Sequence, residues 1–265
     1  MALDAKPNRV VVIGAGFVGA EVAATARDAG LDVTMIEAAP APLMRVCDAD
    51  SGMAIADLHR SHGVDVRLAT GVTSLVGDDQ VSGVALSDGT VIDADVVVIG
   101  IGAIPNTEWL EGSGLTIENG IVCDETCLAA PGIVAAGDVA RWPNQRFGRV
   151  LTRVEQWDNA LDQGAYVARR LLAEAAGEAV EPFAPVPWFW SDQYDRKIQL
   201  AGQPSNNASV VQGSVEDQVF VKVFADDDGN FCGALAWNRP RHAIMARQLL
   251  EARASLAEAT EKLSA

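Results

Sequence analysis

The sequence of 265 residues predicts an α/β fold, and three features near its start carry this prediction. A run of β-branched residues at 9–13 is typical of a buried strand, and a glycine-rich turn follows it directly. Residues 17–27 are rich in alanine and valine and contain no helix breaker, which predicts a helix. A second strand is expected at 32–36. A strand, a tight turn, a helix and another strand in this order predict a parallel sheet with helices packed against it.

The turn has the spacing G-x-G-x-x-G, with glycines at Gly14, Gly16 and Gly19. Gly14 permits the tight turn, Gly16 lets a pyrophosphate approach the main chain, and Gly19 lets the helix pack closely on the strand. The phosphates would lie on free N–H groups at the helix N-terminus, where the helix dipole favours an anion. The pattern therefore predicts a dinucleotide site. The alternative is a glycine-rich turn that binds nothing.

An acidic residue, Glu37, follows the second strand directly. A carboxylate at this place accepts hydrogen bonds from the hydroxyls of an adenosine ribose, and it repels a 2′-phosphate. We therefore expect NADH rather than NADPH. A turn that binds no ligand would not require an acid at this spacing, so Glu37 favours the dinucleotide interpretation.

Composition limits the classes of protein that fit. The length allows two or three domains, and no apolar run without charges reaches about 18 residues, which argues against a membrane span. The first eight residues form no apolar signal segment. The four cysteines make no C-x-x-C pair and no metal-ligand spacing with the three histidines. We therefore expect reduced thiols, no bound metal and a cytoplasmic protein.

The net charge of −16 argues against a nucleic acid as partner, because phosphate binding needs clustered cations. A local exception is a short segment without acids that contains four arginines: Arg141, Arg146, Arg149 and Arg153. Two interpretations stay open for this segment. It is either an ordinary solvated loop or a docking patch for an acidic partner.

Residues 1–105 are expected to form one α/β unit. Its further elements follow from the helical spacing of apolar residues, from short β-branched runs and from a D-G turn between two of these runs. They are a helix at 48–62, a strand at 64–68, a hairpin at 81–86 and 91–94, and a strand at 96–99. The last strand runs into Gly100 and Gly102, a second glycine-rich end where another main chain can come close to a flat ligand.

Residues 106–184 have a different pattern. We expect strands at 120–123 and 133–136 and a helix at 152–172. The second of these strands leads to Asp138, which either binds a ligand hydroxyl or caps a turn. On the helix, Trp157 shares a face with Leu161 and two alanines, and this spacing alone indicates a core residue.

Residues 185–265 follow a proline-rich linker and begin with four aromatic residues within the segment 188–194. So many aromatics either pack a domain junction or stack on a ring. Further along, we expect strands at 197–202, 209–213, 218–225 and 231–237 and a helix at 242–256. The end of the chain, 257–265, is polar and is expected to fray.

Six motifs occur in a fixed order along nearly the whole chain: VVVIGAGFVGAEVAA, VTMIEAAPAPLMR, VVVIGIGAIPNTE, GIVAAGDVARWPN, RVEQWDNALDQG and WFWSDQYDRKIQ. With these motifs the chain resembles the flavin-dependent NADH:ferredoxin, rubredoxin and putidaredoxin reductases. It is also similar to the reductase components of bacterial aromatic-ring dioxygenases. The resemblance implies an enzyme that passes electrons from NADH through FAD to a ferredoxin, a rubredoxin or a similar redox protein.

The resemblance also implies three domains: a Rossmann-like NAD-binding domain at 1–105, the second part of an FAD-binding domain at 106–184, and a C-terminal α+β reductase domain at 185–265. It assigns the NAD pyrophosphate turn to Gly14, Gly16, Phe17, Val18 and Gly19. It further implies that Glu21 orients the nicotinamide carboxamide, that Glu37 holds the adenosine ribose, and that Gly102 brings main chain to the nicotinamide.

On the flavin side, the resemblance implies that Asp138 binds the ribityl chain. Val154, Glu155 and Trp157 would lie close to the isoalloxazine ring, and Trp190 would flank it on the side that faces the electron acceptor. The threonine that usually precedes the Gly-Asp motif has no clear counterpart, because Thr126 is displaced and alanines stand nearer its place.

Family members carry a first glycine-rich fold that grips the ADP half of FAD, and this chain starts where the NAD domain should start. We therefore expect the chain to hold NADH well and FAD weakly or not at all, and to self-associate through uncovered apolar surface on residues 106–184.

One alternative is an NADH-binding module with no flavin and no turnover. An interaction protein like the apoptosis-inducing flavoproteins would need a basic surface. Disulfide reductases are set apart by the WFWSDQ motif and the C-terminal domain.

Overall fold

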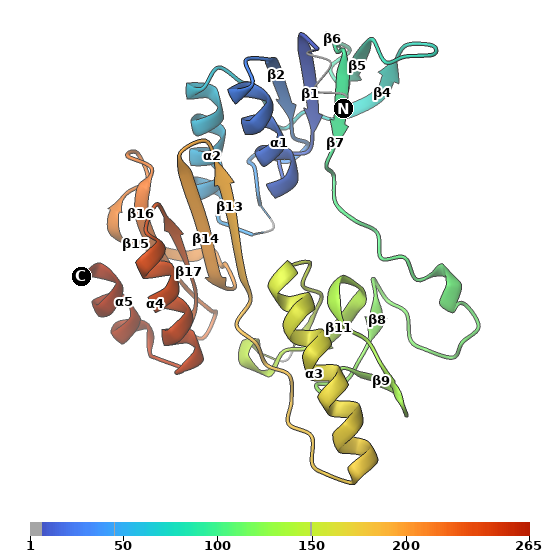
Figure 1. The fold of residues 1–265 in the computed structure, drawn as a ribbon. Coiled ribbons are helices and arrows are strands. Elements are labelled where there is room, and N and C mark those ends of the chain that lie inside the picture. Colours follow the sequence, from blue (N-terminus) through green and yellow to red (C-terminus); the bar gives the residue numbers. More distant parts are fainter. Residues whose placement is uncertain (1–6, 45, 149) are drawn as a thin grey trace.

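The computed structural model describes residues 7–44, 46–148 and 150–265. Its first unit is a four-stranded parallel sheet in the order β3-β2-β1-β7, joined by helices α1 and α2 (Figure 1). The bounds are β1 Arg9–Ile13, α1 Phe17–Asp28, β2 Asp32–Ile36, α2 Ala49–Ser61, β3 Asp65–Arg67 and β7 Val96–Ile99. The predicted parallel sheet is confirmed.

The carboxyl ends of the parallel strands meet at one edge of this sheet. The N–H of Gly14 donates to the carbonyl of Ile36 at 2.7 Å, and the N–H of Gly100 donates to the carbonyl of Ile13 at 2.8 Å. These bonds bring the glycine-rich turn, the end of β2 and the end of β7 together. A ligand at this edge therefore meets residues from three strands.

A small antiparallel sheet lies against the first sheet. It consists of β4 Val72–Val76, β5 Gly83–Leu86 and β6 Val91–Asp93, in that order. Val84 and Leu86 of this sheet share a buried cluster with Val11 and Ile36. The hairpin of β5 and β6 was predicted, whereas β4 was not.

The middle segment has short strands and one long helix. Its elements are η2 Glu108–Leu110, β8 Ile121–Val122, β9 Leu128–Ala130, β10 Ile133–Val134, η3 Gly137–Val139, β11 Ala140–Pro143, η4 Gln145–Phe147, β12 Leu151–Thr152 and α3 Trp157–Ala176. The helix predicted from residue 152 starts later, because Thr152 pairs with Trp142 in a strand and Gln156 is still extended.

The C-terminal unit is a five-stranded antiparallel sheet in the order β13-β14-β17-β16-β15, followed by two helices. The bounds are β13 Trp188–Gln193, β14 Arg196–Gly202, β15 Asn207–Ser214, β16 Val219–Ala225, β17 Phe231–Trp237, α4 Pro240–Glu251 and α5 Leu256–Ser264. The expectation of a fraying end is wrong. Ser255 caps α5 by accepting the N–H of Glu258, and Ala259 and Leu263 are fully buried.

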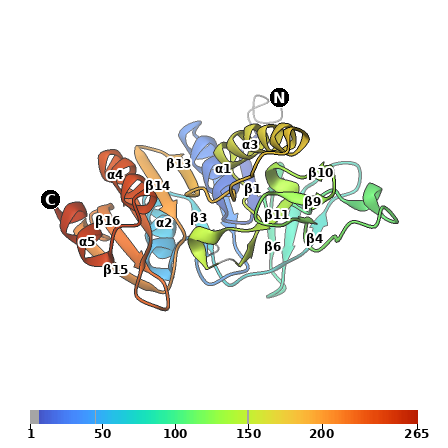
Figure 2. The ribbon, with the colours of Figure 1, turned by 90° about the horizontal axis from the view of Figure 1, so that it is seen from below.

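One hydrophobic core joins the first unit to the C-terminal sheet. Ile55 and Leu58 of α2 share a buried cluster with Phe220 and Trp237 of that sheet. The other face of the sheet packs against α4 and α5. Figure 2 shows α2 beside the C-terminal strands in the view from below. Among the helices of the described ranges, none is long and apolar enough to cross a membrane.

Candidate functional site

Two glycines of the turn are required by the fold itself. Gly14 has φ +97°, and a Cβ at this position would lie 2.4 Å from the carbonyl oxygen of Gly100. A Cβ at Gly19 would lie 1.9 Å from the carbonyl oxygen of Gly14. Any side chain at these positions would therefore push main chain apart. Both glycines have the structural roles that the motif predicts.

Gly16 has no such structural reason to be glycine. Its φ of −73° and ψ of −177° suit any residue, and the nearest described atom to a Cβ there is 4.0 Å away, on Gly100. Gly16 is the N-cap of α1, and the first intrahelical bond runs from Ala20 to Gly16. The space left in front of the helix N-terminus fits a phosphate that approaches the main chain closely.

The first turn of α1 presents amide groups without neutralising side chains. No acidic residue lies in this turn, and within the described part of the chain no side chain caps it. The N–H groups of Phe17, Val18 and Gly19 precede that of Ala20, the first intrahelical donor, and need outside partners. Val18 is 65% exposed. These features fit the predicted pyrophosphate turn.

Glu37 lies at the end of β2, where the sequence places it. Its Oε2 accepts the N–H of Ala15 at 2.7 Å, and its Oε1 accepts the N–H of Ala39 at 2.8 Å. The carboxylate is therefore fixed against the glycine-rich turn by main chain on both sides. Each oxygen keeps a further lone pair that a ribose hydroxyl can use. Its ligand role stays a prediction.

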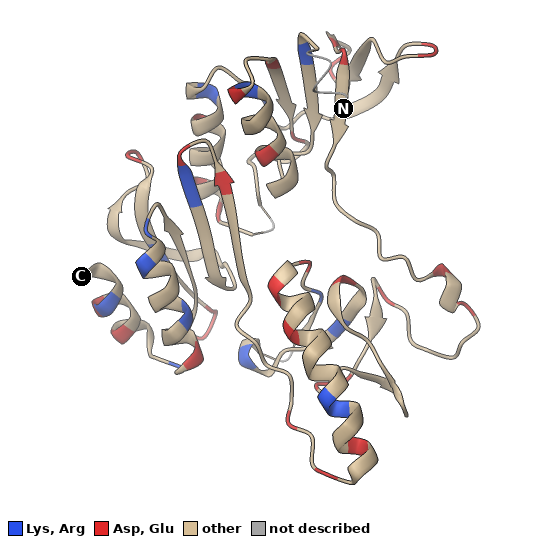
Figure 3. Ribbon diagram, in the orientation of Figure 1, with Lys and Arg blue, Asp and Glu red and all other residues tan. Residues whose placement is uncertain are grey.

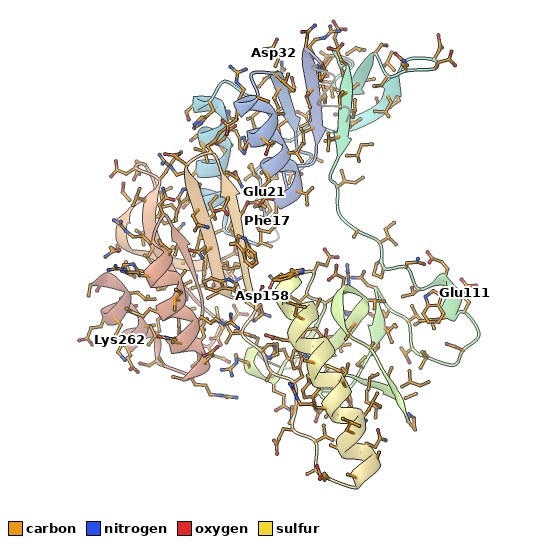
Figure 4. All side chains as sticks on the ribbon, viewed as in Figure 1. Phe17, Glu21, Asp32, Glu111, Asp158 and Lys262 are labelled. Atoms are coloured by element: carbon orange, nitrogen blue, oxygen red, sulfur yellow. The ribbon has the colours of Figure 1, made fainter. Side chains whose placement is uncertain are left out.

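Two predicted site residues of α1, Glu21 and Phe17, contact strand β13. Glu21 accepts a hydrogen bond from the hydroxyl of Ser191 at 2.6 Å. The ring of Phe17 packs on Phe189 with centroids 4.1 Å apart. In Figure 4 both labelled α1 residues lie at the end of α1 nearest the C-terminal lobe. Phe189 thus packs a domain junction, one of the two interpretations of the aromatic segment.

Strand β13 also contacts the start of α3. The N–H of Trp188 donates to Oε1 of Gln156, the residue before the helix, at 3.1 Å. Along β13 burial alternates, so Phe189 and Ser191 are buried while Trp190 is 42% exposed. The strand therefore lies between α1 and α3, and it presents Trp190 to the outside.

The start of α3 has an open apolar surface. Trp157 is the first residue of α3 and is 70% exposed, and Leu161 one turn later is 54% exposed. The local interpretation of Trp157 as a core residue is therefore wrong. An exposed indole at a helix N-terminus is a fitting surface for a flat aromatic ligand.

Asp138 lies beside this surface, in the short helix η3. Its side chain is exposed and makes no hydrogen bond with any described residue, so the turn-capping alternative receives no support. Arg153 donates to the carbonyl of Asp138 at 3.1 Å and forms an ion pair with Glu155. The Nε of Arg153 is buried and finds no acceptor among the described residues. A free carboxylate, an unpaired donor and an exposed indole together fit the flavin side of the prediction.

Two other predicted site residues, Val154 and Gly102, differ in their exposure. Val154 is buried in the core of the middle segment. Gly102 is exposed, with φ +113°, in the chain that leaves β7. Their ligand contacts stay predictions.

Three of the four arginines in the basic segment serve within the fold. Arg141 pairs with Glu118 at 3.0 Å, Arg146 donates to the carbonyl of Leu250 at 2.7 Å, and Arg153 pairs as described above. Arg149 lies outside the described residues. Figure 3 shows basic and acidic positions intermixed around this segment, which argues against a docking patch of free cations.

Buried polar residues around Glu21 were missed by the sequence analysis. Ser191 and Gln193 are fully buried on β13, and His59 on α2 is fully buried as well. For Ser191 and Gln193 the signal was the period of two in the motif WFWSDQ, which puts both residues on the same face of the strand as the buried Phe189.

Two known protein families match most of this chain. Residues 1–164 match the pyridine nucleotide-disulphide oxidoreductases, and residues 188–262 match the reductase C-terminal domain. Rhodocoxin reductase of Rhodococcus erythropolis is 42% identical over 248 residues, which are 92% of this chain and 56% of the relative. Putidaredoxin reductase of Pseudomonas putida is 37% identical over 248 residues, 92% of this chain and 57% of the relative.

Solved structures agree with these matches. A ferredoxin reductase from Rhodopseudomonas palustris has a TM-score of 0.88 at 36% identity, and the match covers 98% of this chain and 66% of that one. The covalent complex of putidaredoxin reductase with putidaredoxin has a TM-score of 0.83 at 32% identity, covering 97% of this chain and 63% of the matched chain.

The fold and the glycine-rich turn are those of a Rossmann-like α/β protein with a reductase-type C-terminal domain. The chain belongs to the pyridine nucleotide-disulphide oxidoreductase family. It spans about 56% to 60% of the length of the first curated relatives that it matches.

Proposed function

We propose that this protein is a flavoprotein reductase that passes electrons from NADH through FAD to a small ferredoxin-type carrier. The observation that carries the proposal is the open N-terminus of α1, where Gly16 leaves space for a phosphate and Glu37 closes the ribose side. FAD, when bound, accepts a hydride from NADH and releases its electrons singly to a one-electron carrier.

On the nucleotide side, the residues of this chain bind and orient the coenzyme. The amides of the first turn of α1 hold the pyrophosphate, and Glu37 accepts the ribose hydroxyls. Glu21, one turn further along α1, orients the nicotinamide carboxamide, and Gly102 supplies main chain on the other side. The fixed position of Glu21 against Ser191 supports this role.

On the flavin side, Asp138 would hold the ribityl chain, with Val154, Glu155 and Trp157 beside the ring. Trp190 would flank the ring on the acceptor side. The exposure of Trp157 and the free carboxylate of Asp138 support this assignment.

The acceptor class rests on similarity. The relatives include a rhodocoxin reductase and a putidaredoxin reductase, and one similar structure is a reductase bound to putidaredoxin.

For the domains of this chain we propose the limits 1–105, 106–184 and 185–265. The four free, buried cysteines support a cytoplasmic location.

A second candidate is an NADH-binding module that takes up no flavin. The exposure of the α3 surface favours it, because Trp157 and Leu161 are left uncovered. Anaerobic titration of the 265-residue chain with FAD and then NADH separates the two candidates. Bleaching of flavin absorbance and reduction of an added ferredoxin support the reductase. NADH binding without flavin uptake supports the module.

The same uncovered surface supports self-association with a second copy. Large apolar side chains are exposed along the middle segment: Trp109, Ile133, Trp157, Leu161 and Leu172. Light scattering during size-exclusion chromatography tests this, and we expect a mass above that of one chain. FAD addition should lower the mass if flavin covers the α3 surface, and a monomer at all concentrations would contradict the proposal.

A further inference from the structure

A continuous set of buried and half-buried polar side chains joins α1 to the C-terminal lobe. The hydroxyl of Ser191 lies 2.6 Å from Oε1 of Glu21, and Nε2 of Gln193 lies 3.1 Å from that hydroxyl. Oε1 of Gln193 lies 3.1 Å from Nε2 of His59. At the far end, Nδ1 of His59 lies 3.0 Å from the hydroxyl of Tyr194. We call these five residues the relay.

The chemistry of the groups fixes the direction of every hydrogen bond in the relay. A carboxylate only accepts, so Ser191 donates to Glu21, and the serine oxygen then accepts from the amide of Gln193. The carbonyl of Gln193 must accept in turn, which puts the proton of His59 on Nε2. Nδ1 of His59 is then an acceptor for the hydroxyl of Tyr194. All four donors point toward Glu21, an arrangement in which each bond strengthens the next.

The protonation states required by this order agree with the surroundings. Burial lowers the pKa of His59 to about 4, and burial raises the pKa of Tyr194 to about 12. At neutral pH the imidazole is therefore neutral and the phenol keeps its proton. The neighbouring His62 also acts to lower the pKa of His59, after burial as the main cause.

The far end of the relay is held in a strained turn. Tyr194 has φ +54° in the two-residue connection between β13 and β14, a position where glycine is favoured. Its ring stacks on His62, with centroids 3.7 Å apart and planes 9° apart. Such a conformation persists where the surroundings fix it, and here the stack and the bond to His59 do so.

We propose that Ser191, Gln193 and His59 are positioning residues that hold the Glu21 carboxylate in one orientation at the nicotinamide end of the dinucleotide site. The inference rests on the proposed function, because that function places Glu21 at the nicotinamide. The relay occupies Oε1 of Glu21 and leaves Oε2 without a hydrogen bond to any described residue. Oε2 is thus available to a carboxamide N–H, and the C-terminal lobe contributes to coenzyme recognition through β13.

Calorimetric titration with NADH and with ADP-ribose tests this on the 265-residue chain. ADP-ribose keeps the pyrophosphate and the adenosine but lacks the nicotinamide. Ser191→Ala should weaken NADH binding by about tenfold, since a hydrogen bond to a charged group is lost, and leave ADP-ribose binding unchanged. The matched control Ser209→Ala, in an exposed position on the opposite edge strand β15, should change neither.

A double substitution separates positioning from general damage. In a Glu21→Ala background, Ser191→Ala should cause no further loss of NADH affinity. Equal weakening of both ligands by Ser191→Ala, or no weakening of either, would overturn the relay. If the unsubstituted chain binds neither ligand, the proposed nucleotide site is wrong, and the inference about the relay is then wrong as well.

Nitrogen NMR of the unsubstituted chain tests the bond order without any substitution. We expect the His59 ring to be neutral with its proton on Nε2 at pH 7. A neutral ring with the proton on Nδ1 would reverse the direction of the relay and contradict the inference.

Discussion

The ammonium group of Lys222 lies 2.6 Å from the carboxylate of Asp48, and the two side chains are only 4% and 12% exposed. This ion pair joins the start of α2 to strand β16, so it ties the first unit to the C-terminal lobe. The other carboxylate oxygen of Asp48 accepts the hydroxyl of Ser51 at 2.6 Å. Removal of one partner leaves a buried charge that the remaining hydrogen bond does not compensate.

Lys222→Met should therefore lower the free energy of unfolding by about 3–5 kcal/mol. The matched control is Lys262→Met on α5, because Lys262 forms an exposed ion pair with Glu258. This variant should lose at most about 0.5 kcal/mol of its free energy of unfolding. Urea unfolding followed by far-UV circular dichroism measures both. Equal losses in the two variants would show that the buried pair does not stabilise the junction.

Gly16→Ala and Gly19→Ala should separate ligand binding from folding. A Cβ at Gly16 meets no described atom closer than 4.0 Å, so Gly16→Ala should cost at most about 1 kcal/mol of stability. The methyl group would occupy the space for the pyrophosphate and weaken NADH binding by about tenfold or more. Calorimetry and thermal unfolding of the same samples measure the two effects.

Gly19→Ala should instead destabilise the fold. Its Cβ would lie 1.9 Å from the carbonyl oxygen of Gly14, so the helix must move from the strand. We expect a stability loss of about 1–3 kcal/mol. If Gly16→Ala destabilises the fold more than Gly19→Ala, the assignment of Gly16 to the ligand is wrong.

His59 should make stability depend on pH in weakly acidic solution. Burial lowers its pKa to about 4 in the fold, whereas an unfolded histidine titrates near 6.5. Between these values the unfolded chain binds more protons, so stability is complete above about pH 6.5 and falls as the pH approaches 4. The loss should reach about 3 kcal/mol.

The contribution of His59 is isolated by His59→Gln. Denaturant unfolding at several pH values should show a shallower slope between pH 4 and 6.5 for this variant than for the unsubstituted chain. His242, whose pKa is also lowered by burial, is present in both proteins and cancels in the comparison. Identical slopes would contradict the neutral, buried state of His59.

Local rules were enough for the parallel sheet of the first unit, although they missed strand β4 beside it. The strand at Arg9–Ile13, the helix from Phe17 and the acid after β2 each follow from a few neighbouring residues, and the structure has all of them in the predicted order. The start of α3 did not follow, because Thr152 is helix-compatible locally and becomes a strand only by pairing with Trp142. The helix α5 depends on Ala259 and Leu263 packing against distant strands.

The relay could not be predicted from local pattern either. Tyr194 and His59 are 135 positions apart in the sequence, and only the packing of β13 on α2 brings them together. Similarly, the exposed indole of Trp157 lies on a helix face whose spacing indicates burial. In both cases tertiary packing decides what the local pattern leaves open.

The central claim is that the N-terminus of α1 binds an adenine dinucleotide and that Glu37 rejects a 2′-phosphate. Glu37→Gln removes the negative charge and keeps one carbonyl oxygen, which can accept a hydrogen bond from one of the two N–H groups, of Ala15 and Ala39, that Glu37 now binds. The decisive measurement is calorimetric titration of the unsubstituted chain and of Glu37→Gln with NADH and with NADPH. We predict that the unsubstituted chain binds NADH at least about tenfold more tightly than NADPH, and that Glu37→Gln narrows this ratio by strengthening NADPH binding. Equal affinity for the two coenzymes in the unsubstituted chain, or an unchanged ratio in Glu37→Gln, would contradict the claim.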